Sequence, residues 1–363
     1  MSLRTPSRRQ ILKYGAAGAA AGMTGGLAMP AIAQTRDVSF TLAWLPQGSS
    51  LYTYVAKEKG FFDGLNVSIS RGFGSLPAAQ SLAAKQFDYG VVLAMPLILG
   101  IAQGLPITAI ATVDYDAMMG VGVLADSPIK SAADLVGKKI GAVPTSAEYP
   151  FFPVYLERSG INPDDVELVH LDNKVLERAL TERQVDAIMG IGSSSMPVML
   201  SKGLDVRWIL YSSGGLQTYG QTIVSNPETI AADPGVTKAV VEGLTEAIAF
   251  TMTDPEESTE LFFKAVPEMA LNQNGKEFAR IGLGMWQYAI AQPEAIDHAI
   301  GYGDPTIYTD MIDLVMTYNG TPEMTKPAVE DVFTNDYVGS QTLTTEQWDA
   351  VKARVSEFGK LLS

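Results

Sequence analysis

Apolar and polar residues alternate along the chain in a way that defines a first structural unit over residues 40–70. Residues 40–44 repeat with a period of two, which predicts a half-buried strand. After a Pro-Gln-Gly-Ser-Ser turn, apolar side chains recur every three or four residues over 51–59, which predicts a helix that ends at Gly60. A second strand is expected over 66–70, so this region is one strand–helix–strand unit.

Strand and helix patterns keep alternating to about residue 225, and helical patterns dominate afterwards. Such alternation is typical of α/β folds, and a chain of 363 residues exceeds the size at which a single core usually stops growing. We therefore expect an α/β protein of two lobes joined by two crossing strands, with a helical C-terminal part. Further strands are expected over 86–92, 106–113, 119–124, 139–143, 164–171, 185–190, 207–211 and 219–225, and further helices over 76–85, 152–159, 174–182, 237–253, 255–265, 275–289 and 305–318; the crossings are 119–124 and 219–225.

The first residues have the composition of an export signal. An Arg-Arg pair at residues 8–9 precedes a Gly/Ala-rich run over 14–29, and the Ala-Ile-Ala triplet at 31–33 has the small residues of a cleavage site. This order of segments resembles a twin-arginine signal and predicts a mature, soluble chain that starts near Gln34 in the periplasm. We assign residues 1–33 to the signal, 34–121 and 223–363 to lobe 1, and 122–222 to lobe 2.

Composition excludes several kinds of site. The chain has a net charge of −14, and removal of residues 1–33 takes away four cations and no acid, which leaves −18. We therefore expect no nucleic-acid partner and no attraction to anionic membranes, and no apolar run is long enough for direct membrane insertion. The chain has no cysteine and only two histidines, so we expect no disulfide, no metal site and no cofactor.

Catalytic signatures are mostly absent. The chain has no H-E-x-x-H, P-loop, G-x-G-x-x-G or G-x-S-x-G motif at a suitable place. His170 and His298 are expected to be structural, because a general base needs a partner that the sequence does not supply. The serines at 193–195 are expected to form a hydrogen-bonding loop, because a nucleophilic serine needs an adjacent base. We expect no catalytic residue and no enzyme activity.

Several motifs together resemble a known family. The chain carries W-x-P at 44–46, Y-V-A-K-E-K-G-F-F at 54–62, G-L-x-V-x-I at 64–69 and F-T-N-x-Y at 333–337. These motifs resemble periplasmic substrate-binding proteins of ABC importers, in the branch for thiamine-pyrimidine precursors, alkanesulfonates and nitrate. The resemblance implies the type II periplasmic binding protein fold, with two Rossmann-like lobes. It also implies a monomer that captures a small-molecule ligand between the lobes and delivers it to an ABC permease and its ATPase.

Ligand contacts are expected in the loops after the strands, because open α/β sheets bind ligands at the carboxyl ends of their strands. Aromatic faces there suit flat ligands, hydroxyls and free N–H groups at a helix start suit carbonyls or anions, and carboxylates favour N–H donors. For the aromatic candidates the alternative is core packing, and for the polar ones it is helix capping or surface exposure. The candidates are Trp44, Gln47, Tyr52, Met95, Asp114, Tyr115, Thr145, Ser146, Glu148, Tyr149, Ser193 and Ser194.

Two kinds of ligand remain open. Pyrimidine-binding relatives carry a glutamate after V-D-A-x-x-G, where this chain has Ile-Gly-Ser-Ser at 191–194, whereas the F-T-N segment resembles the pyrimidine type. Pro197 resembles a proline of the sulfonate-binding members. We expect a small polar heterocycle of the pyrimidine type, with an alkanesulfonate or another small organic anion as the alternative. A pyrimidine-biosynthesis enzyme and a receptor-docking sensor domain are further classes; the enzyme is disfavoured because its cysteine-rich motif is missing.

Overall fold

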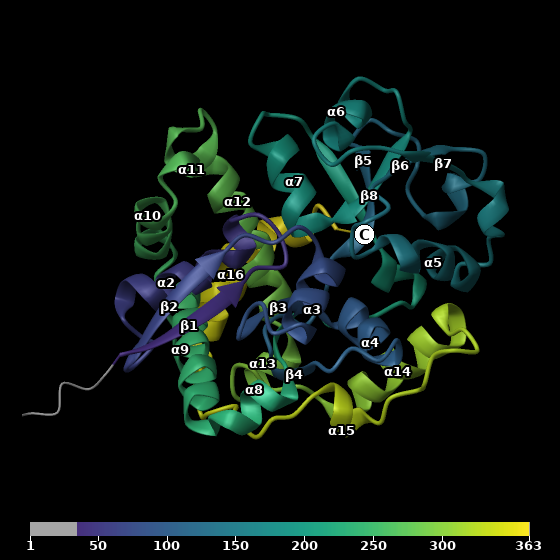
Figure 1. Cartoon of the computed structure of the whole chain (residues 1–363). Coiled ribbons are helices and arrows are strands. Elements are labelled where there is room, and N and C mark those ends of the chain that lie inside the picture. The colour runs from purple at the N-terminus through teal and green to yellow at the C-terminus, as the bar shows by residue number, and fades with distance from the viewer. Residues whose placement is uncertain (1–34, 363) are drawn as a thin grey trace, which may run out of the picture. The chain divides into compact units, whose positions relative to one another are not determined.

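The computed structural model describes residues 35–362, and the folded unit begins at Asp37. The expected signal, residues 1–33, lies outside the described residues. Two five-stranded sheets form the framework of the unit, with helices packed around each (Figure 1). We call the sheet that contains the first strands sheet A and the other one sheet B.

The two sheets share one topology. Sheet A has the strand order β2-β1-β3-β10-β4, and sheet B has the order β7-β6-β8-β5-β9. In the fourth place of each sheet, one strand (β10 or β5) runs antiparallel to both of its neighbours. The strands are β1 (Arg36–Thr41), β2 (Leu65–Ser70), β3 (Tyr89–Leu93), β4 (Thr108–Thr112), β5 (Met119–Leu124), β6 (Lys139–Ala142), β7 (Glu167–His170), β8 (Ala187–Ile191), β9 (Val206–Leu210) and β10 (Gln221–Ser225).

The reversed strands result from the way the chain passes between the sheets. The chain leaves β4 of sheet A through residues 113–118 and enters sheet B as β5, and it returns through residues 215–220 to enter sheet A as β10. The strands expected to cross therefore lie directly after the irregular segments that connect the sheets. Two short connections of this kind suit a hinge. The division into lobes at residues 121/122 and 222/223 stays a prediction.

Helix boundaries follow local signals in the sequence. Helix α2 ends at Gly60, whose φ of 72° lies in the left-handed region that glycine adopts without steric cost. The α-helices are α2 (Leu51–Lys59), α3 (Ser75–Ala83), α4 (Ala94–Ala102), α5 (Phe152–Arg158), α6 (Leu176–Thr181), α7 (Gly192–Leu200), α8 (Pro227–Ala232), α9 (Pro234–Thr253), α10 (Pro255–Ala265), α11 (Pro267–Leu271), α12 (Gly275–Ile290), α13 (Pro293–Asp297), α14 (Pro305–Asn319), α15 (Val329–Val332) and α16 (Thr345–Gly359). Within residues 35–362, none of these helices has the length and apolar character needed to cross a membrane.

Helix α12 packs against elements of both halves of the molecule. It packs against α7, which follows β8 of sheet B, and against the short 3-10 helix η1 (Gly48–Ser50), which precedes α2. The approach of η1 requires glycine, because a Cβ on Gly48 would lie 2.3 Å from the backbone nitrogen of Leu283. In the same helix, Trp286 is buried and stacks on Tyr52 of α2, with ring centroids 5.1 Å apart and an interplanar angle of 3°. Residues around η1 are therefore fixed against α12.

Candidate functional site

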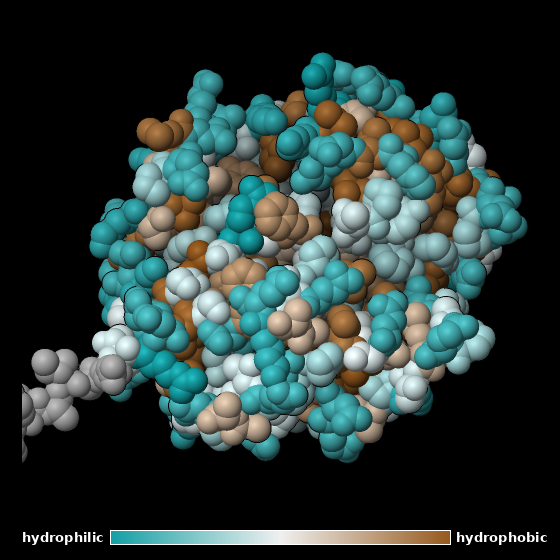
Figure 2. Space-filling view, in the orientation of Figure 1, coloured by the Kyte–Doolittle hydropathy of each residue, from teal (hydrophilic) through white to brown (hydrophobic). Residues whose placement is uncertain are grey.

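A cavity of about 810 Å³ lies between the two sheets. Its lining includes residues that follow β1 and β4 of sheet A, residues that follow β6 and β8 of sheet B, and residues of α12. Figure 2 shows the surface hollowed near the middle of this face of the molecule. The volume lies within the roughly 300–1,000 Å³ that is common for small-molecule sites, and strand ends of α/β sheets are where such sites form.

The segment after β1 forms the first wall of the cavity. Trp44 is half-buried there and lines the cavity. Gln47 is buried, and its Nε2 donates to the Oγ of Ser49 at 2.8 Å and to the Oγ of Ser194 at 2.7 Å. Because Ser194 belongs to α7 on the sheet B side, this hydrogen bond joins the two walls. The first wall therefore combines an aromatic side chain with a polar link to the opposite side.

Asp114, on the first connection between the sheets, and Gln221, the first residue of β10, form the floor. Asp114 is 4% exposed, and its Oδ1 accepts the backbone N–H of Gln221 at 2.8 Å. The side chain of Gln221 accepts from the hydroxyl of Tyr52 at 3.3 Å and donates to the carbonyl of Ser49 at 3.0 Å. Burial raises the pKa of Asp114 to about 8, because the charged form loses its hydration. The floor therefore holds a carboxyl group that titrates near neutral pH.

Polar residues of sheet B form the second wall. Glu148 is buried, and burial raises its pKa, although a hydrogen bond from the hydroxyl of Ser146 opposes that shift. The expected loop over 193–195 is wrong, because α7 begins at Gly192 and holds these serines in its first turn. The first turn of a helix has backbone N–H groups without intrahelical partners, and serine suits that position. This wall therefore offers hydroxyls, a helix start and a carboxyl group.

Carboxyl groups predominate around the cavity. Besides Asp114, burial raises the pKa of Asp116, Glu148 and Glu177, all of which line the cavity. The cations of the lining, Arg71 and Lys202, are exposed. In the part of the chain that the structure describes, no group of three or more metal-ligating side chains is placed to hold a metal ion. The lining therefore combines carboxyl groups that burial makes harder to ionise with cations that stand at exposed positions.

Seven of the twelve predicted site residues line the cavity, and five do not. Tyr52 and Met95 are fully buried in the core. Tyr52 stacks on Trp286, and Met95 lies at the start of helix α4, where we expected a loop after the strand. Thr145 is exposed, and the hydroxyl of Tyr149 lies 2.9 Å from Nε2 of His170. The lining residues are Trp44, Gln47, Asp114, Ser146, Glu148, Ser193 and Ser194.

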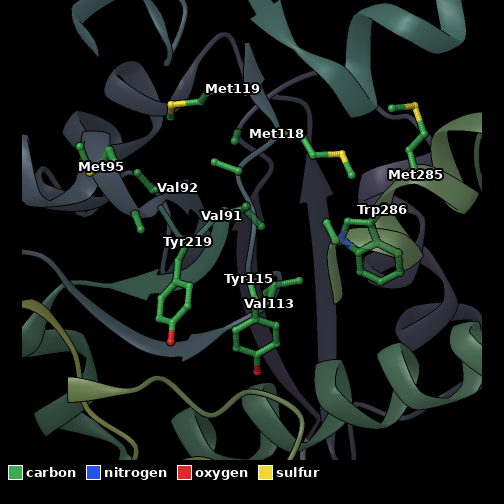
Figure 3. Close-up of a cluster of buried hydrophobic side chains, with 14 of the residues drawn as sticks. Val91, Val92, Met95, Val113, Tyr115, Met118, Met119, Tyr219, Met285 and Trp286 are labelled. Atoms are coloured by element: carbon green, nitrogen blue, oxygen red, sulfur yellow. The ribbon is translucent and has the colours of Figure 1, made fainter. Parts of the chain in front are cut away.

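Tyr115 points away from the cavity. Its hydroxyl donates to the carbonyl oxygen of Tyr302 at 3.0 Å, and its ring lies edge-on to Tyr219 at 5.4 Å between centroids. Figure 3 shows Tyr115 and Tyr219 side by side with both hydroxyls directed to the same side, away from Met118. Tyr115 therefore packs against Tyr219, whereas its neighbour Asp114 lines the cavity.

Sequence reasoning missed several lining residues, among them Asp116, Glu177, Gln221 and Trp286. Asp116 could have been found, because it lies two residues after Asp114 in the same connection. Trp286 gave no local signal, because a tryptophan in an amphipathic helix is expected in the core. It reaches the cavity only because α12 packs against η1 and α7.

Comparisons with known proteins agree with this architecture. Over 247 residues the chain is 27% identical to a putative thiamine biosynthesis protein of Haemophilus influenzae, covering 66% of this chain and 77% of that protein. It is 25% identical to a formylaminopyrimidine-binding protein of Halalkalibacterium halodurans, covering 65% of this chain and 76% of that protein. The structure of the periplasmic aliphatic sulphonate binding protein of Escherichia coli superposes with a TM-score of 0.63 at 18% identity, covering 83% of this chain and 99% of that one. The predicted fold is thereby confirmed.

Two family models also match the sequence. Residues 5–25 match the model of the twin-arginine translocation pathway signal sequence, which confirms the predicted export. Residues 48–258 match the model described as NMT1/THI5 like, and this range covers more than half of the chain and every strand from β2 to β10. The chain therefore belongs to the NMT1/THI5 like family.

Proposed function

We propose that this protein is the solute-binding component of an ABC import system and captures a flat heterocycle of the pyrimidine type that carries N–H groups. The ligand binds between lobe 1 (34–121 and 223–363) and lobe 2 (122–222) and is passed to a membrane permease driven by its ATPase. The observation that carries the proposal is the buried carboxyl group of Asp114 at the floor of a cavity with Trp44 on its wall.

The charges of the lining support an N–H-rich ligand. Asp114 and Glu148 are buried and Asp116 is half-buried, and the pKa values of all three carboxyl groups are raised. A ligand N–H would replace the hydrogen bonds to water that these groups have lost. An anion in the same place would lie against these oxygens and make their ionisation still less favourable. A neutral or cationic heterocycle therefore fits the interior better than a sulfonate does.

The aromatic side chain of the first wall supports a flat ligand. Trp44 is half-buried in the ligand-free protein, so part of its ring surface remains to be covered. Stacking of a heterocycle on an indole contributes about 0.5–1.5 kcal/mol beyond the burial of apolar area. The name of the formylaminopyrimidine-binding relative points to the same class of ligand.

A small organic anion is the second candidate, and one observation favours it. Ser193, Ser194 and Ser195 lie in the first turn of α7, and helix N-termini with free N–H groups bind anions. The variant Glu148→Gln separates the candidates, because it removes a negative charge from the opposite part of this wall. A heterocycle that bonds to Glu148 should bind more weakly to the variant, whereas an anion should bind more tightly.

The first experiment is identification of the ligand. Native mass spectrometry of protein purified from the periplasm, followed by analysis of the released molecule, should find a nitrogen heterocycle of pyrimidine type. A sulfonate or carboxylate without N–H donors would overturn the proposed ligand class and leave the binding role intact. The protein should be a monomer in both states, and the bound form should be heavier than the free form by the mass of one ligand.

The two connections between the sheets suggest a mechanism of ligand capture by hinge bending. Hinge bending at residues 113–118 and 215–220 would close the cavity on the ligand, so small-angle scattering should give a smaller radius of gyration in the bound state. The ligand should also raise the melting temperature by mass action. The ligand itself should be recovered chemically unchanged, because the proposed role involves no catalysis. Equal radii in both states would argue for a rigid pocket.

A further inference from the structure

The C-terminal segment forms a further link between the two halves of the molecule. Helix α16 packs on α12 and α9, and α9 packs on α2, so α16 belongs to the sheet A half. Directly after α16, the carbonyl oxygen of Leu361 accepts the backbone N–H of Trp208 in β9 at 2.9 Å, and Leu362 forms a parallel bridge with the same residue. In Figure 1 the chain passes from α16 to the sheet B side, where its C-terminal end is labelled. We call residues 360–362 the C-terminal strap.

The strap begins at a fixed point on α12. Phe358 is buried, and its ring lies so close to α12 that a Cβ on Gly284 would stand 2.1 Å from its Cε2. Glu357 also forms an ion pair with Arg280 of α12, with 3.2 Å between the charged atoms. Because a buried ring and an ion pair both hold the last turn of α16 to α12, the strap cannot move independently of that helix.

The other end of the strap is attached to a residue that also contacts the hinge. Trp208 is 0% exposed, and its Nε1 donates to the carbonyl oxygen of Met118 at 3.2 Å. Met118 lies in the first connection between the sheets and has a φ of 50°, in the left-handed region that residues other than glycine seldom adopt. The same carbonyl accepts the N–H of Gly192, at the start of α7, at 2.8 Å. Trp208 therefore joins the strap to the hinge.

The strap has little slack. The N–H of Leu361 donates to the carbonyl of Phe358, and that of Leu362 donates to the carbonyl of Gly359, so the segment is coiled as a turn. Three coiled residues rise about 5 Å, whereas three extended ones span about 10 Å. Trp208 can therefore move about 5 Å away from the end of α16 before its hydrogen bond to Leu361 has to break.

Protection of an open sheet edge does not by itself explain why the strap crosses between the halves. Sheet A also ends in an edge strand, β4, and there Phe333 forms a parallel bridge with Ala109. Phe333 follows α15, which packs against α4 and β4 in the same half. A neighbouring segment is thus sufficient to cover an edge. The cover of β9 in sheet B comes instead from a helix of the sheet A half.

We propose that the C-terminal strap is a tether that limits how far the cavity opens. This inference rests on the proposed function, because it concerns the hinge bending by which the ligand is captured. With the strap in place, the ligand-free protein stays near the closed form. A larger fraction of the molecules is then ready to bind, and less affinity is lost to closure.

The test lengthens the tether without removing its contacts. Gly-Ser-Gly-Ser is inserted between Gly359 and Lys360, so that the residues after it can still pair with β9. Because the chain has no cysteine, spin labels can be attached to Leu271→Cys in α11 and Val175→Cys before α6, which are exposed positions on the two halves. Double electron–electron resonance measures the distance between the labels in protein freed of ligand by unfolding and refolding. The insertion should lengthen the mean distance by about 5 Å or more.

Two further variants complete the test. The matched control carries the same insertion between Gly339 and Ser340, in the loop that joins α15 to α16, and it should leave the distance unchanged. Deletion of residues 360–363 removes the tether and should lengthen the distance at least as much as the insertion after Gly359 does. Circular dichroism shows whether each variant is folded, and the insertion alone decides if the deletion variant is not.

The outcomes separate this inference from the proposed function. An unchanged distance in the insertion variant overturns the tether, even if the deletion lengthens the distance, because the strap would then act only as a cover of β9. The proposed function would stand in that case. Conversely, if the purified protein carries no heterocycle, the proposed ligand class is wrong, but the label distances still decide about the tether because they are measured without ligand.

Discussion

The floor and the second wall of the cavity carry buried carboxyl groups that are held in different ways. Asp114 on the connection between the sheets is fixed by a backbone N–H and by the close backbone of Gly220. Glu148 on the sheet B side is held by the hydroxyl of Ser146, two residues away in the same loop. Burial raises the pKa of both groups. The difference indicates a rigid acceptor at the floor and a locally adjustable one on the wall.

The largest expected effect concerns the dependence of stability on pH. The pKa of Asp114 is about 8 in the folded protein, above its unfolded value of 3.8, so the unfolded chain binds fewer protons between these values. The free energy of unfolding should therefore fall as pH rises from about 4 to 8, by up to about 5 kcal/mol for this group. In Asp114→Asn this decrease in the free energy of unfolding should be absent. Urea unfolding of both proteins without ligand, at several pH values, measures the difference.

Glu148→Gln should change the pH dependence in the same direction, since the pKa of Glu148 is also raised. The free energy of unfolding of the wild-type protein could instead stay constant from pH 4 to 8, or change with pH as much as that of Asp114→Asn. Either result would contradict a strongly raised pKa of Asp114 in the folded protein.

The next effect concerns the aromatic part of the first wall. Trp44→Ala should weaken binding of the pyrimidine-type ligand by about 1.5–4 kcal/mol, the sum of lost apolar contact and lost stacking. Trp44→Phe should recover most of the affinity. Because Trp44 is half-buried, the melting temperature of the ligand-free protein should change little. A loss of about 3–5 kcal/mol in stability with normal affinity in the folded fraction would instead identify Trp44 as a core residue.

Gly220→Ala tests the rigid position of Asp114. The new Cβ would overlap Oδ1 of Asp114, so the carboxyl has to move away from the N–H of Gln221. Urea unfolding should show a loss of about 1–3 kcal/mol, as for other overpacked sites. The matched control is Gly235→Ala in the first turn of α9, where the nearest atom to a new Cβ lies at an ordinary 3.4 Å. Equal stabilities of the two variants would show that the floor is adjustable.

The smallest expected effect concerns the link between the walls. Ser194→Ala removes the acceptor of the hydrogen bond from Gln47, which joins the sheet A side to α7. Loss of that bond should cost about 0.5–1.5 kcal/mol and shift ligand-free protein toward an open form with a larger radius of gyration. Ser356→Ala, which removes only a hydrogen bond within α16, should leave the radius unchanged. No difference between the two variants would mean that this bond does not restrain opening.

Much of the fold could be predicted because its signals are local. The helical spacing over 51–59 and the stop at Gly60 depend on residues within a few positions, and α2 lies where they indicated. The strand expected over 40–44 overlaps β1 (Arg36–Thr41) only at its last two residues, so that prediction was shifted toward the C-terminus. The helices expected over 237–253 and 275–289 match α9 and α12 closely. The start of α7 differs, because serines suit both a loop and the first turn of a helix.

The sequence by itself determined the α/β class, the export signal, the family and the strand-end loops from which the cavity is built. Only the tertiary structure decided which side chains of those loops line the cavity, because packing against distant elements sets the direction of each side chain. Asp114 lines the cavity, whereas the neighbouring Tyr115 packs against Tyr219. It also brought Trp286 into the same cavity lining as Asp114, although the two residues are far apart in the sequence. A contact of that range depends on how α12 packs between the sheets, and local patterns carry no information about it.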